Sequence, residues 1–176
     1  MSKQLEQLFR ECFAASHATE LLGGAVEPLY QPATQDGELH RIYYREDFFA
    51  SALHEVAHWC IAGEERRQQL DYSYWYAPDG RDASQQRAFE QVEVKPQAVE
   101  WHFALASSQT FRISADNLSG DSGDITDFAE AVRRQAERYC RLSLPSRAQV
   151  FRLALAAHFG GVACPDASCF VQDRAA

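Results

Sequence analysis

Apolar residues recur along this chain with the spacing of amphipathic helices. At the N-terminus they follow an i, i+3, i+4, i+7, i+8 pattern, which predicts a first helix with one buried face. These positions are Leu5, Leu8, Phe9, Cys12 and Phe13. The same kind of spacing predicts a long helix over residues 125–139 and a last helix that Ser146 caps and Gly160-Gly161 ends.

Stretches between the helices carry the signals of strands and turns. Residues 39–44, LHRIYY, form a strand candidate, and residues 25–38 predict a short strand and a loop. Gly23-Gly24 is expected to end the first helical region before them. Aromatic and polar residues alternate over residues 70–76, which predicts another strand.

Residues 83–107 carry a helical pattern that a proline interrupts. Pro96 lacks the N–H group of a helical residue, and its ring clashes with the carbonyl four residues back, at Val92. We therefore expect a kink or a restart between Val92 and Pro96. Phe111 and Ile113 predict a short strand after this region.

One stretch, residues 48–67, carries the clearest chemical signal. It reads FFASALHEVAHWCIAGEERR and contains His54-Glu55-Val56-Ala57-His58. On a helix, residues four apart share one face, so His54 and His58 can bind a single metal ion while Glu55 points into the site. Apolar residues surround this motif, which predicts a helix that is buried on most sides, with Gly63 as its C-terminal cap.

Composition and charge narrow the class of protein. The chain has 176 residues, 46% of them hydrophobic, which is typical of a single globular domain over residues 1–176. Because helices outnumber strands, the predicted fold class is α+β, a single compact domain. The formal net charge of −8 disfavours nucleic acid as the main partner. No apolar run has the length of a membrane span and no signal-peptide core is present, so we expect a cytoplasmic protein without membrane attachment.

The five cysteines do not predict a disulfide framework or a zinc knuckle. Their number is odd and no CxxC pair occurs, so reduced thiols are expected. Cys60 lies two residues after His58, which turns it away from the histidine face and predicts a core position. Cys164 and Cys169 lack two further ligands nearby, and their role stays open.

A third protein ligand must come from outside the two-histidine motif. The downstream candidates are Glu90, Glu93, Glu100 and His102. Glu93 is favoured because Val92 and Val94 flank it, and buried carboxylates are rare unless they are paired or bound to a metal. Glu90 and Glu100 have more polar surroundings and are expected to be exposed, and His102 is expected to be a partly buried histidine without a metal.

Several motifs in order resemble the elongation factor P hydroxylases, the family also called EpmC or YfcM. They are HEVAHWCIAG (54–63), YWYAPDGRD (74–82), FEQVEVKPQA (89–98) and DNLSGD (116–121). The resemblance covers roughly residues 48–121 and implies a metal set of His54, His58 and Glu93. It also implies a fold in which helices pack on a small sheet, as in the YbeY endoribonucleases and the zincins.

The resemblance further implies the reaction: hydroxylation of an elongation factor P lysine that already carries a β-lysyl group. Two histidines and one carboxylate with open positions suit non-haem Fe(II) with dioxygen, whereas the same motif in a zinc peptidase or endoribonuclease would activate water, with Glu55 as the base. A non-catalytic metal-binding module is a third reading. Use of 2-oxoglutarate stays open, and so does the catalytic role of Glu55.

The implied substrate has a long cationic side chain, so its receiving cleft is expected to offer carboxylates and aromatic rings. Asp79, Asp82, Trp75 and Tyr76 follow the metal helix and are candidates for this role, although a strand and turn explain them equally well. Elongation factor P is the expected partner, in a transient complex, and the protein is expected to act as a monomer.

Overall fold

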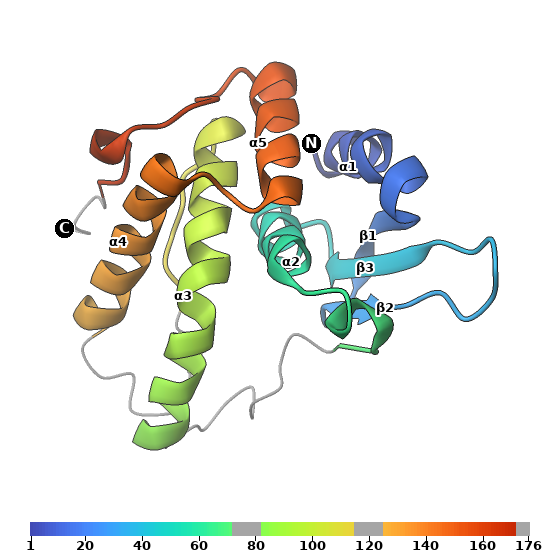
Figure 1. The fold of residues 1–176 in the computed structure, drawn as a ribbon, viewed down its shortest axis with the longest axis horizontal. Coiled ribbons are helices and arrows are strands. Elements are labelled where there is room, and N and C mark those ends of the chain that lie inside the picture. Colours follow the sequence, from blue (N-terminus) through green and yellow to red (C-terminus); the bar gives the residue numbers. More distant parts are fainter. Residues whose placement is uncertain (72–81, 115–124, 172–176) are drawn as a thin grey trace.

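The structure is a computed structural model that describes residues 1–71, 82–114 and 125–171 (Figure 1). Its α-helices are α1 (Ser2–His17), α2 (Phe49–Ile61), α3 (Ala83–Ala106), α4 (Thr126–Leu142) and α5 (Ser146–Phe159). Its strands are β1 (Thr19–Ala25), β2 (Leu29–Gln31) and β3 (His40–Arg45), and the short 3₁₀ helices η1 and η2 span Arg66–Gln68 and Ala167–Cys169. Among the described residues, no helix is long and apolar enough to cross a membrane.

The three strands form one small sheet in the order β1-β3-β2, with β1 parallel and β2 antiparallel to β3. The strand expected over residues 39–44 is confirmed as β3. Strand β1 is not predicted from the sequence, because Gly23-Gly24 indicates the end of the first helical region. The structure explains Gly23: an added Cβ atom would lie 2.6 Å from the Tyr44 ring, so only glycine lets β1 pass this side chain.

Helices α1, α2, α3 and α5 share the main core with the sheet. Aromatic rings dominate it: the Phe9 ring lies 5.3 Å from Trp59 and 5.6 Å from Phe151. Helix α2 lies between the sheet and α3, as Figure 1 shows, and Ala52, Val56 and other residues of α2 are fully buried. Other elements therefore enclose helix α2, as expected for the stretch that carries His54 and His58.

Helix α3 runs without a break through Pro96, so the expected restart is wrong. The cost of a proline inside a helix is about 3 kcal/mol. Helix α3 tolerates it because α2, α4 and α5 all pack against it, and because Asp82 caps its first turn by accepting hydrogen bonds from the N–H groups of Ser84 and Gln85. Asp82, a candidate for the substrate cleft, has this structural role.

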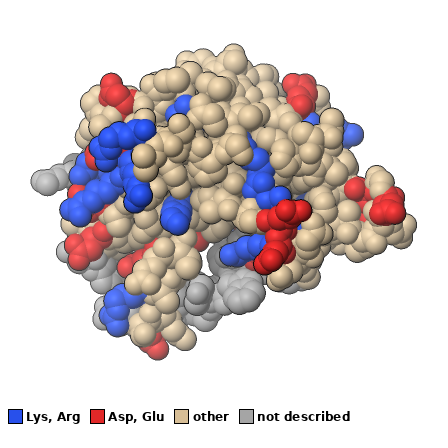
Figure 2. Space-filling model, in the orientation of Figure 1, with Lys and Arg blue, Asp and Glu red and all other residues tan. Residues whose placement is uncertain are grey.

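The described residues of the C-terminal half that lie outside helices form no strand. Residues 111–114 form no strand, contrary to expectation. Ser146 is the first residue of α5 and makes no capping bond, whereas Gly160 ends that helix as expected, in a left-handed conformation with φ of 76°. Figure 2 shows mixed positive and negative side chains over the α4 side of the molecule, where Arg134 pairs with Glu130.

An arginine from α5, and not the expected glycine cap, donates hydrogen bonds to the free carbonyl groups at the C-terminus of α2. Gly63 has no left-handed backbone, and the C-cap residue Ala62 has φ −55° and ψ 127°. Arg147 reaches across, and its Nη2 lies 2.9 Å from the carbonyl oxygen of Trp59 and 2.7 Å from that of Ala62. Its guanidinium also lies over the Trp59 ring, 4.8 Å from the centroid.

Replacing Arg147 by methionine is expected to lower the free energy of unfolding by about 2 kcal/mol, because charged hydrogen bonds to buried carbonyls are lost. Urea unfolding followed by circular dichroism measures this change. Arg134→Met removes a largely exposed arginine from α4 and serves as the control, with little expected effect. Equal stability of the two variants would contradict the capping role.

A second cluster joins α3, α4 and η2, and His102 lies fully buried beside it. Its Nε2 is 3.0 Å from the Ala136 carbonyl, and its ring lies 4.8 Å from that of Phe170. Burial lowers the pKa of His102 to about 4, and the nearby Arg152 adds to this effect, although the bond to Ala136 opposes it.

Because the folded pKa of His102 lies below the unfolded value of about 6.5, the unfolded chain takes up more protons at mildly acidic pH. The stability that the folded protein gains from keeping His102 neutral is therefore fully present above pH 6.5 and is lost as the pH falls toward 4. We expect about 2 kcal/mol of stability to disappear between pH 7 and pH 5. Urea titrations at both pH values test this expectation. His102→Gln should make the free energy of unfolding depend less on pH, and an unchanged pH dependence in this variant would contradict the role of His102.

Candidate metal centre

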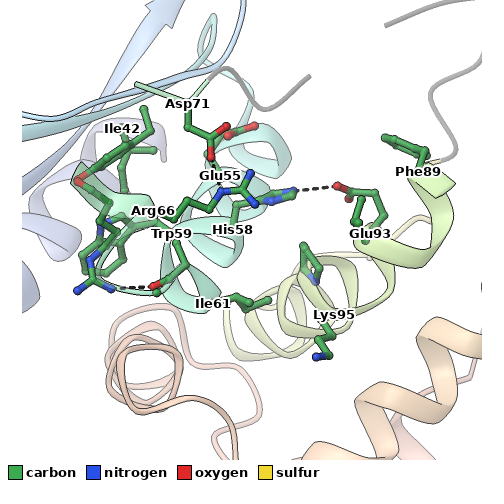
Figure 3. A pocket seen from close by; sticks show the side chains of 16 residues that line it. Ile42, Glu55, His58, Trp59, Ile61, Arg66, Asp71, Phe89, Glu93 and Lys95 are labelled. Carbon is green, nitrogen blue, oxygen red and sulfur yellow. Dashed lines mark hydrogen bonds and ion pairs between the residues drawn. The ribbon is translucent and has the colours of Figure 1, made fainter. Parts of the chain in front are cut away.

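Helices α2 and α3 lie side by side and bring three potential metal ligands together. His54 and His58 project from one face of α2, and Glu93 projects from α3 toward them. The ligand atoms of these three residues all lie within 4.8 Å of one another. The Nε2 of His58 is 3.2 Å from Glu93 Oε1, a contact drawn in Figure 3, and the Nε2 of His54 is 3.7 Å from Glu93 Oε2.

The spacing of these atoms fits one metal ion. The Nε2 atoms of His54 and His58 are 3.0 Å apart. Two nitrogens that each lie about 2.1 Å from a common ion, at right angles, are separated by about 3.0 Å. Two imidazole nitrogens and a carboxylate oxygen are a donor set that suits iron and zinc alike. The residues therefore fit a metal ion but do not discriminate between these two metals.

Electrostatics favour a negative Glu93 in this position. The carboxylate is buried, with 3% of the residue exposed. Burial raises its pKa, but His58, and then His54 and Gln97, outweigh burial and lower the pKa of Glu93 to about 2. An ionised carboxylate is the form that binds a metal.

Glu100 also belongs to this site, against the expectation that it is exposed. Only 9% of Glu100 is exposed, and its Oε2 lies 2.8 Å from the Nδ1 of His54. Burial lowers the pKa of His54, but Glu100 and then Glu93 and Glu55 outweigh it, so that this pKa rises to about 10. A carboxylate at Nδ1 orients the ring and leaves Nε2 facing the cluster.

Gln97 connects Glu93 to the segment that follows α3. Its Nε2 donates to Glu93 Oε2 at 3.4 Å and to the Ser114 carbonyl at 2.7 Å, and its Oε1 accepts from the Ser114 N–H. Glu93, Gln97 and Glu100 have the i, i+4, i+7 spacing of one helical face. This spacing is the sequence signal that could have revealed Gln97 and Glu100.

The other candidate residues occupy different places. Glu90 lies one turn before Glu93, where Gln86 donates to it at 3.1 Å. His102 is buried against α4, outside the cluster. Glu55 is 5% exposed and lies beside the two histidines on α2. The remaining candidates for the substrate cleft, Trp75, Tyr76 and Asp79, lie outside the described residues.

Two cavities meet at this cluster. One of about 340 Å³ is lined by His58, Glu55 and Glu93 and extends toward the sheet (Figure 3). The other, of about 230 Å³, is lined by His54, Glu55 and Glu93 and extends toward the arginines Arg45 and Arg112. The cluster is therefore accessible from two sides, with Glu55 between them.

Sequence comparisons relate nearly the whole chain to one protein family. The sequence profile of the EpmC family, described as elongation factor P hydroxylase, matches residues 8–168. The chain belongs to the EpmC family. The elongation factor P lysine hydroxylase of Haemophilus influenzae is 46% identical over 162 residues, which cover 90% of this chain and 91% of that protein. The EpmC match therefore extends well beyond residues 48–121 and includes α1 from residue 8 onward, the sheet, the cluster and α5.

Proposed function

We propose that this protein hydroxylates a lysine of elongation factor P. The observation that carries the proposal is the cluster of His54, His58 and Glu93 in a chain that belongs to the EpmC family and is 46% identical to an elongation factor P lysine hydroxylase. We propose further that the substrate lysine already carries a β-lysyl group. Residues 1–176 would act as a single catalytic domain, as a monomer, and in the cytoplasm, where translation factors work.

In this proposal His54, His58 and Glu93 hold Fe(II). Iron with dioxygen supplies the oxidising power for an unactivated C–H bond, which zinc and acid–base side chains lack. Three protein ligands would leave further positions on the metal for dioxygen or substrate. Zinc could replace iron in the purified protein, because the donor set suits both.

The surrounding side chains have supporting roles. Glu100 accepts a hydrogen bond from the Nδ1–H group of His54 and so favours the tautomer in which Nε2 binds the metal. Gln97 holds the Glu93 carboxylate from the other side. Glu55 lines both cavities, and we propose that it moves a proton or orients water next to the metal.

Mass spectrometry of elongation factor P tests the proposal. The Fe(II)-loaded protein is mixed in air with β-lysylated elongation factor P and a reductant such as ascorbate, which supplies the two electrons that reduce the second oxygen atom to water, with and without 2-oxoglutarate. We expect a gain of one oxygen atom on the modified lysine, and no gain with His54→Ala. Hydrolysis of peptides or RNA by the zinc form, abolished by Glu55→Gln and without any oxygen gain by the iron form, would instead indicate a metallohydrolase.

A further inference from the structure

The larger cavity is lined by a carboxylate that does not belong to the metal cluster. Asp71 lines this cavity together with His58 and Glu93. In Figure 3 its side chain points into the cavity from the sheet, while Glu93 faces it from α3. The cavity thus runs from the metal ligands to a second acidic group.

The Asp71 carboxylate is held in place, but only one of its two oxygens accepts a hydrogen bond from a described residue. Its backbone N–H and carbonyl both bond to Tyr30 of β2, at 3.0 and 2.7 Å, which fixes its position at the edge of the sheet. Its Oδ2 accepts a hydrogen bond of 2.6 Å from Arg66 Nε. Its Oδ1 is buried and has no hydrogen-bond partner among the residues that the structure describes. A buried oxygen of this kind is stabilised when a donor reaches it.

Apolar side chains form much of the wall of this cavity. Trp59, Ile42, Ile61 and Phe89 line the same cavity. An aliphatic chain with a positively charged end matches this arrangement, because its methylene groups contact the walls and its ammonium group reaches the carboxylate.

The cations that line the cavity do not compete strongly for Asp71. Arg67 donates from Nη1 to the Ala62 carbonyl at 2.7 Å. Lys95 is exposed and points away from His58 and Asp71 in Figure 3. Arg66 contacts Asp71, but 57% of its side chain is exposed, so the pair is of the weak surface type and a substrate ammonium group can displace Arg66 from the carboxylate.

We infer that Asp71 receives the terminal ammonium group of the substrate, so that a lysine-type side chain lies along the larger cavity with its methylene groups next to the metal ligands. This inference rests on the proposed hydroxylase function, and it assigns the part of the site that recognises a primary amine. Asp71 binds and orients the chain, and the metal ligands face the carbon to be oxidised.

The binding of two small probes to the metal-loaded protein tests the inference without turnover. Nα-acetyl-lysine amide carries the ammonium group, and Nα-acetyl-norleucine amide replaces it by a methyl group. NMR titration of each probe should show that the wild-type protein prefers the lysine probe. Asp71→Asn should weaken binding of the lysine probe about tenfold or more and leave the norleucine probe unchanged. Asp36→Asn removes an equal charge from an exposed loop and should change neither affinity.

Arg66→Gln separates recognition from a structural role of the ion pair. If Asp71 receives the ammonium, this variant leaves the carboxylate free and binds the lysine probe at least as tightly as the wild type. If the pair is merely structural, Arg66→Gln and Asp71→Asn weaken both probes alike, which overturns the inference. Equal affinity of the wild-type protein for both probes overturns it as well.

The kinetic measurement distinguishes this inference from the proposed function. With β-lysylated elongation factor P, Asp71→Asn should raise KM about tenfold or more and change kcat little. Acetylation of the terminal amine of the substrate should impair the wild type more than the variant. If the wild type hydroxylates nothing but binds the lysine probe through Asp71, the hydroxylase proposal fails and the amine site stands. If the wild type hydroxylates its substrate and Asp71→Asn has an unchanged KM, the amine site fails alone.

Discussion

Replacing Glu93 by glutamine is expected to strip the metal from the protein while leaving the fold intact. The variant keeps the shape of a buried side chain but loses the negative charge that faces His54 and His58. Loss of an outer-shell partner typically weakens metal binding by 10–100-fold, so loss of a direct ligand should weaken it by more than about 100-fold. Hydroxylation should then fall below detection, because two histidines alone hold the ion poorly.

Metal content by mass spectrometry, measured together with product formation, tests this expectation. Glu90→Gln is the matched control, because it makes the same change one turn away on α3, at a residue outside the cluster. The Glu93→Gln protein should unfold at a urea concentration similar to that of the metal-free wild type. Full iron occupancy and normal activity in Glu93→Gln would exclude Glu93 as a ligand.

Replacing Glu100 by alanine is expected to weaken metal binding by about 10–100-fold, although Glu100 is not itself a ligand in this arrangement. Its carboxylate lies 2.8 Å from the Nδ1 of His54. Without it the ring is free to rotate or to exchange tautomers, so the Nε2 lone pair faces the cluster for less of the time. Glu100→Gln keeps an acceptor oxygen at this position and should retain much of the affinity.

Competition between the protein and a chelator of known affinity measures these differences at fixed pH. A positioning residue predicts a metal affinity that falls in the order wild type, Glu100→Gln, Glu100→Ala. A general loss of packing would lower the metal affinity of both variants alike. Glu90→Ala controls for removal of a carboxylate from α3. An affinity of Glu100→Ala equal to that of the wild type would show that His54 is oriented by other contacts.

Local patterns in the sequence determined much of the architecture. The helices α1, α4 and α5 follow from apolar residues at helical spacing, because one buried stripe per helix is what lets an α-helix pack on a core. The position of α2 and the pairing of His54 with His58 follow for the same reason, since residues four apart share a face whatever the surroundings. Glu93 is buried as its flanking valines suggested, but Val92 is itself 51% exposed, so the position of Glu93 on the face toward α2 decides its burial.

Tertiary structure decided the features that depend on distant neighbours. Glu100 looked polar and exposed along the chain, but α2 covers it and supplies His54 as its partner. Pro96 remains inside α3 because packing against neighbouring helices outweighs a local penalty. Arg147 caps α2 from 85 residues beyond Ala62. No local pattern encodes such contacts, because each depends on which surfaces meet once the chain has folded.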